Sequence, residues 1–171
     1  MNPQDAITHN NVSSYIYKLG HFWQSFNNME LFLRLYLHQK SGGDKKDFLN
    51  YSQAVIGPVL EENPITDYRS FGQLCNALND LQEENNKLNF SEFIELRDAM
   101  AHGRVSGDGL GNMHVIKYAR ARNGKVTVEY KKQLTQTDFE RIIDKMAWLS
   151  MEISRRMGAK MPDDFIPDKY A

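Results

Sequence analysis

Three residues near the middle of the chain have side chains that could do chemistry together: Arg97, Asp98 and His102. The imidazole of His102 can exchange a proton near neutral pH, and the guanidinium of Arg97 suits phosphate oxygens. Asp98 precedes His102 by four residues, so on a helix its carboxylate can orient the imidazole. Arg97 lies about 140° around an ideal helix from His102, so the two converge only if the helix ends there. Gly103 predicts a left-handed helix end at that point.

A general base beside a phosphate-binding cation is the minimum for cleaving RNA without a metal or another cofactor. The base takes the proton of a ribose 2′-hydroxyl, the oxygen attacks phosphorus, and the cation stabilises the developing charge. An acid must also protonate the leaving oxygen, and one motif supplies one histidine. Two motifs facing each other in a symmetric homodimer would supply two. The alternative is that these residues only form ion pairs at a helix end, where a cationic His102 is favourably placed.

The segment from Arg104 to Lys132 is basic, with seven positive and two negative residues, although the whole chain carries a net charge of -1. Its aromatic residues Tyr118 and Tyr130 could stack on the bases of single-stranded RNA. Equally, its charges could be those that exposed strands use against aggregation. The residues that we expect to bind RNA are Arg104, Lys117, Arg120, Arg122 and Lys125.

Hydrophobic periodicity predicts four main helices. The first spans about residues 11–38, with apolar side chains recurring at intervals of three and four. A second should bury Tyr68 on its apolar side, and a weaker helical pattern covers residues 48–60. Capping patterns predict where the last three main helices begin. These patterns are Asn63 with Pro64, Asn89 with Glu92, and Thr137 with Glu140.

Two strand-like runs, residues 113–119 and 126–130, flank Asn123 and Gly124. An Asn-Gly pair between β-branched and aromatic runs is a strong signal for a β-hairpin. The glycine-rich stretch 105–111 before them cannot continue a helix and is expected to be a loop.

A length of 171 residues with 41% hydrophobic residues suits one globular domain. The fold class that we expect is mainly α, a bundle of four main helices over residues 1–171. The β-hairpin, at about 113–132, is inserted before the last long helix, and residues 161–171 form a C-terminal tail.

Two residues inside the predicted helices raise separate questions. Glu30 interrupts the apolar face of the first helix and needs a partner, either Arg34 at i+4 or a basic residue of the central motif. The single cysteine, Cys75, lies in an apolar stripe and is expected to be a core residue. With no leader-like N-terminus and no long apolar run, we expect a cytoplasmic protein without a membrane span.

The run from Arg97 to His102 resembles the Arg-x4-6-His motif of the HEPN superfamily, in which a polar residue such as Asp98 often follows the arginine. In that family the motif ends a helix of an α-helical bundle, after a long, mostly apolar first helix. The resemblance implies a HEPN-like bundle and a metal-independent endoribonuclease with a composite site across a homodimer. It also implies a toxin or antiphage-defence effector, with an antitoxin or regulatory protein as its partner.

Two other interpretations compete with the ribonuclease. Some HEPN-like domains are non-catalytic, so the chain could instead be a dimeric regulatory module that binds nucleic acid or protein. The third is a metal hydrolase using His102, His114 and Asp108, whose spacing matches no compact ligand motif. We therefore expect no metal site and no cofactor.

Overall fold

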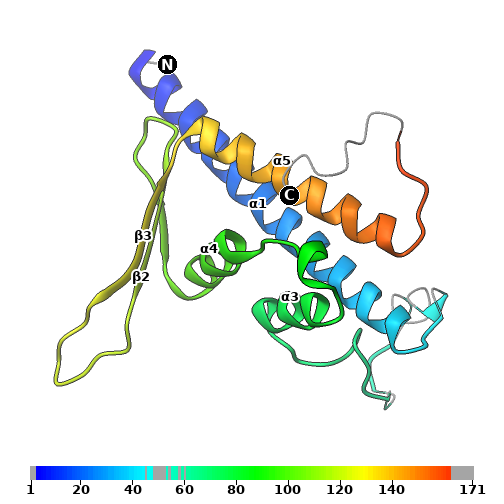
Figure 1. The fold of residues 1–171 in the computed structure, drawn as a ribbon. Helices are drawn as coiled ribbons and strands as arrows, with labels where there is room; N and C mark the ends of the chain where they lie inside the picture. Colours follow the sequence, from blue (N-terminus) through cyan, green and yellow to red (C-terminus); the bar gives the residue numbers. More distant parts are fainter. Residues whose placement is uncertain are drawn as a thin grey trace. The chain divides into compact units, whose positions relative to one another are not determined.

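The computed structural model describes residues 3–44, 46–47, 53, 55–57, 59 and 61–162, with side chains from residue 13 onward. Within this part the fold is mainly helical, with four α-helices and a small antiparallel sheet (Figure 1). The weak helical pattern over 48–60 and the tail 161–171 fall largely outside the described residues. The elements in chain order are α1 (Pro3–Lys40), α3 (Phe71–Asp80), a 3-10 turn η1 (Glu84–Asn86), α4 (Ser91–His102), β1 (Arg104–Gly107), β2 (Met113–Tyr118), β3 (Val128–Leu134) and α5 (Gln136–Arg156).

The chain divides into two compact units, and α1 and α5 each contribute to both. The first unit comprises Met1–Phe26 and Phe90–Lys145, and the second comprises Asn27–Asn89 and Met146–Ala171. The first unit therefore contains α4, the sheet, the central motif and every residue expected to bind RNA.

Apolar side chains from α1, α4, the sheet and α5 form the core of the first unit. The ring of Phe22 in α1 meets that of Phe139 in α5 edge-on, with 4.7 Å between their centroids. Burying a side chain of this kind stabilises the fold by roughly 1.5–3 kcal/mol. Helix α4 contacts β1 and β2 and buries one of its sides. Its last two residues, Ala101 and His102, are exposed to solvent. The buried residues of α4 and the sheet are Phe93, Leu96, Ala99, Met100, Met113, Val115 and Leu134.

The sheet has three antiparallel strands in the order β1-β2-β3. The predicted hairpin is confirmed, because Asn123 and Gly124 both adopt positive φ, 51° and 72°, as a tight type I′ turn requires. The third strand was not predicted. The stretch expected to be a loop begins with β1, which pairs with β2 in a register that joins Arg104 to Ile116. Its short, glycine-containing sequence has little strand propensity of its own, so this pairing depends on the neighbouring strand.

All three of the helix starts predicted from capping patterns are wrong in position. Helix α3 begins at Phe71, after a capping box between Ser70 and Gln73. Asn63 instead accepts a hydrogen bond from the Ile65 N–H at 2.9 Å and so caps an isolated turn. Because the helix begins later than predicted, Tyr68 lies outside it and is fully exposed.

The starts of α4 and α5 also differ from the predictions. Helix α4 begins at Ser91, and its N-cap is Phe90, whose side chain makes no capping bond. The capping box of α5 lies two residues before the predicted one. There Thr135 and Asp138 exchange hydrogen bonds, with the Thr135 N–H donating to Asp138 at 3.0 Å and the Asp138 N–H to Thr135 at 3.2 Å.

In the second unit, Arg34 settles the question of Glu30. Its guanidinium pairs with Glu30 at 3.0 Å and with Asp67 at 2.9 Å, and it donates to the backbone carbonyls of Pro64, Asp67 and Arg69. The i+4 partner is thus confirmed, and it also anchors the segment before α3.

Cys75 in α3 is a core residue, as predicted, with 1% of its surface exposed. Burial raises the pKa of its thiol, which suppresses the reactive thiolate. Trp148 in α5 lies off the apolar stripe of that helix, yet it is only 4% exposed. Among the described residues, no helix combines the length and apolar character that a membrane crossing needs.

Candidate functional site

Helix α4 ends at His102 because the next residue lies against another strand. Gly103 has φ -97° and ψ -154°, so the predicted left-handed stop is wrong and the chain instead extends directly into β1. A side chain at this position would collide with the carbonyl oxygens of Ala99 and Ile116. The glycine is therefore required by the close approach of β2, which turns the chain away from the helix and leaves His102 in the last turn.

Asp98 and His102 lie side by side, as their spacing predicts. One carboxylate oxygen of Asp98 is 3.7 Å from Nε2 of His102, close enough for electrostatic interaction and too long for a hydrogen bond. The two side chains are 46% and 66% exposed, respectively. The imidazole is therefore open to a substrate and has a carboxylate beside it.

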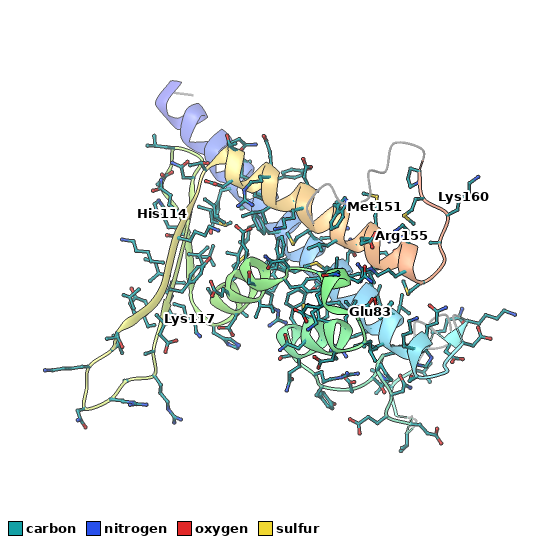
Figure 2. The ribbon with its side chains drawn as sticks, viewed as in Figure 1. Glu83, His114, Lys117, Met151, Arg155 and Lys160 are labelled. Atoms are coloured by element: carbon teal, nitrogen blue, oxygen red, sulfur yellow. The ribbon has the colours of Figure 1, made fainter. Side chains whose placement is uncertain are left out.

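The other carboxylate oxygen of Asp98 accepts a hydrogen bond from Lys117 at 2.7 Å. Lys117 also pairs with Glu129 on β3 at 3.2 Å. Hydrogen bonds to Asp98 and then Glu129 raise the pKa of Lys117. Two carboxylates already occupy this ammonium, so it is less available to RNA than the sequence alone indicates. Figure 2 shows Lys117 on the part of the sheet beside α4.

Arg97 is half-buried on α4. Both Arg97 and His102 belong to the helix, so the five-residue spacing leaves them about 140° apart around its axis. The helix does stop directly after His102, but the backbone gives Arg97 and His102 different faces. Within one chain, the closer pair is therefore Asp98 and His102.

The hairpin beyond the sheet forms a basic recess of about 470 Å³. Three of the five residues expected to bind RNA line it: Arg120, Arg122 and Lys125. Glu129, the partner of Lys117, also lines it. Arg104 is exposed at the start of β1 and donates to the carbonyl of Gly103 at 3.3 Å.

The two tyrosines proposed for stacking differ in accessibility. Tyr118 is 45% exposed and directly precedes Ala119, which lines the recess. Tyr130 is half-buried on β3, and burial raises its pKa to about 12. Tyr118 is thus the better platform for a base.

Glu92 fixes the start of α4 through an ion-pair cluster that sequence patterns did not indicate. Its carboxylate accepts hydrogen bonds from Arg141 of α5 at 2.7 and 3.1 Å and from Lys132 of β3 at 2.8 Å. The bond from Arg141, followed by that from Lys132, lowers the pKa of Glu92 to about 2 although burial opposes this. The cluster joins three elements that are distant in sequence and thereby positions the motif helix.

His114 belongs to a different part of the sheet. Its Nε2 is 3.5 Å from Asp108, whose pKa is lowered to about 2, chiefly by the hydrogen bond from the Asn112 side chain. Figure 2 shows His114 nearer the α1 end of the sheet than Lys117. Within the described part of the chain, no three His, Cys, Asp or Glu side chains gather as a metal site would need. The metal hydrolase interpretation therefore gains no support.

The comparisons with known proteins add no relative. Searches with family models, of curated proteins and of solved structures each gave no match to this chain. The assignment of a function accordingly rests on the residues of the motif and on their surroundings.

Proposed function

We propose that this chain is a metal-independent endoribonuclease of HEPN type. His102 takes the proton of a ribose 2′-hydroxyl, and that oxygen attacks the adjacent phosphorus. The 5′-oxygen of the next nucleotide then leaves with a proton, which gives a 2′,3′-cyclic phosphate and a 5′-hydroxyl. Arg97 stabilises the charge that develops on the phosphoryl oxygens, and Asp98 orients the imidazole. Such an enzyme would act as a toxin or defence effector held in check by an antitoxin or regulatory protein.

The observation that carries this proposal is the exposed imidazole of His102, with a carboxylate beside it, at the end of a helix that is buried on one side. A general base must reach its substrate and keep a fixed orientation. Two-thirds of the His102 side chain is exposed, and Asp98 is 3.7 Å away. Glu92 anchors the other end of the same helix. A merely structural histidine has no need of this combination.

The leaving oxygen needs an acid, and a second copy of the chain would supply it. His114 is three residues from Lys117 along β2, so their side chains point to opposite faces of the sheet. Because Lys117 is the residue that contacts Asp98, His114 lies on the wrong face to serve the same site. A homodimer with facing motifs would provide a second histidine, and it would let Arg97 act across the interface from His102.

The test is cleavage of a single-stranded RNA in EDTA, with the product ends analysed. We expect a 2′,3′-cyclic phosphate, and no cut where the scissile nucleotide carries a 2′-deoxyribose. His102→Ala should lower the rate by about 10²–10⁴-fold, and Arg97→Ala should lower it as well. His114→Ala is the matched control, because it removes another histidine paired with a carboxylate, and it should cleave like the wild type.

Three results would contradict this proposal: intact RNA with the wild-type protein, activity that depends on a metal, or equal loss in His102→Ala and His114→Ala. Sedimentation of the wild-type protein should show a dimer under the cleavage conditions. If the protein cleaves RNA as a monomer, the site is not shared between two copies of the chain, and that part of the mechanism is wrong.

The second candidate is a non-catalytic module that binds single-stranded RNA. The basic recess favours it, because Arg120, Arg122 and Lys125 gather there and the exposed Tyr118 lies close to them in sequence. A module of this kind would bind RNA, with an affinity that falls steeply with salt, and would leave it intact. The triple substitution Arg120→Ala, Arg122→Ala and Lys125→Ala should then abolish binding, whereas His102→Ala should not change it.

A further inference from the structure

Lys117 stands at the junction between the motif helix and the hairpin. Its ammonium lies 2.7 Å from Asp98 on α4 and 3.2 Å from Glu129 on β3. The side chain is only 26% exposed. A series of neighbouring ionisable side chains thus runs from Glu129 through Lys117 and Asp98 to His102.

We propose that Lys117 is a positioning residue, which holds the Asp98 carboxylate in the place where it faces His102. The role of His102 in cleavage rests on the function proposed above, whereas the positioning itself does not. Asp98 has two carboxylate oxygens, and Lys117 binds the one that His102 does not face. A short, charge-assisted hydrogen bond of this kind fixes the rotation of a carboxylate. Without it, the half-exposed Asp98 side chain would be free to turn away from the imidazole.

This role differs from the phosphate-binding role that the sequence suggests for Lys117. A phosphate-binding lysine raises affinity for every RNA and makes binding more sensitive to salt. A positioning lysine changes the catalytic step and leaves binding largely unchanged. Glu129 and Asp98 already neutralise the ammonium, which favours the second role.

The charges of the three residues allow a matched test. Asp98, Lys117 and Glu129 together carry a net charge of -1. The single variant Lys117→Met would change this net charge to -2 and leave two unpaired carboxylates, which would repel RNA for that reason alone. The double variant Lys117→Met with Glu129→Gln restores the net charge of -1 while still removing the hold on Asp98. Any loss in the double variant is then due to positioning.

These variants should fold, because ion pairs with partly exposed partners contribute little stability. Lys131→Met is the control for the loss of a lysine. Lys131 is exposed on strand β3, and its side chain lies on the opposite face of the sheet from that of the next residue, Lys132. Glu129→Gln alone is the control for the loss of the acid. Lys117→Arg keeps a cation beside Asp98 and should rescue the function.

The experiment measures the imidazole proton resonances of His102 by NMR, assigned with His102→Ala, together with kcat and KM on a single-stranded RNA. We expect the resonances to move in Lys117→Met and in the double variant, and to stay in place in Lys131→Met and Glu129→Gln. We expect kcat of the double variant to fall about 10–100-fold, as misplaced catalytic groups typically cause, with KM unchanged. Lys117→Arg should recover most of kcat.

Unchanged His102 resonances in the double variant would overturn the proposal. So would a raised KM with an unchanged kcat, which would return Lys117 to phosphate binding. If the resonances move but the wild-type protein cleaves no RNA, the positioning stands and the ribonuclease proposal fails. The two proposals can therefore fail independently.

Discussion

Replacing Glu92 by glutamine tests whether the motif helix is held by the charge of a single carboxylate. Glu92 on α4 accepts hydrogen bonds from Arg141 of α5 and Lys132 of β3. Glutamine keeps the shape of the side chain and one acceptor oxygen, and it removes the negative charge. Both cations would then face each other across a neutral amide.

The magnitude follows from the pKa of Glu92, which falls from 4.5 to about 2 in the folded protein. A difference of one in pKa corresponds to about 1.4 kcal/mol, so the full difference would give roughly 3 kcal/mol at neutral pH. The side chain of Arg141 is 44% exposed, and solvent weakens such pairs. We therefore expect Glu92→Gln to lower the free energy of unfolding by about 1–2 kcal/mol at pH 7.

The pH dependence has a definite sign. Because the pKa of Glu92 is lower in the folded protein, its stabilisation is complete above about pH 5 and is lost as the pH falls towards 2. Urea unfolding of the wild type and Glu92→Gln should differ at pH 7 and should converge in acid. Glu95→Gln, an exposed glutamate one turn later on α4, should unfold like the wild type. Equal stability of Glu92→Gln and wild type at pH 7, or a gap that persists at pH 2, would refute the reasoning.

Two further predictions concern the backbone at the motif and the buried thiol. Gly103→Ala should destabilise the protein by about 1–3 kcal/mol, because the added carbon meets the carbonyl of Ile116. Gly20→Ala, in open space on α1, should stabilise the protein by about 0.5–1 kcal/mol. Urea unfolding that gives both variants the same stability would contradict this. Cys75 should react with a thiol reagent at least about 100-fold more slowly in the native protein than in urea, because the structure around the buried thiol must first open locally. A fast reaction of the native protein would show that packing around α3 does not protect the thiol.

Local patterns in the sequence predicted most of the elements. The spacing of apolar residues indicated the long first and last helices, and the Asn123-Gly124 pair indicated the hairpin. The pairing of Glu30 with Arg34 also followed from their i+4 spacing. Each of these signals acts over one or two turns of chain, so the information is present in neighbouring residues.

The errors arose where local patterns had competitors. The stretch after Gly103 has a loop-like composition, and it becomes β1 only because β2 offers hydrogen-bonding partners. Asn89 and Glu92 match a capping box, but the N-cap is Phe90, one residue later, and the carboxylate of Glu92 binds two cations from distant elements. These charge-assisted hydrogen bonds come from elements that are distant in sequence, so no local pattern indicates them.

The sequence by itself determined that Asp98 and His102 would be neighbours, because a helix brings residues four apart onto one face. It also determined that a basic hairpin would follow them. Only the tertiary structure decided which residues hold the motif in place. Lys117, 19 residues beyond Asp98, binds the Asp98 carboxylate. Arg141, 49 residues beyond Glu92, binds the Glu92 carboxylate and so anchors the helix itself. Such contacts depend on how the helix, strands and α5 dock, and no spacing within a single element encodes that.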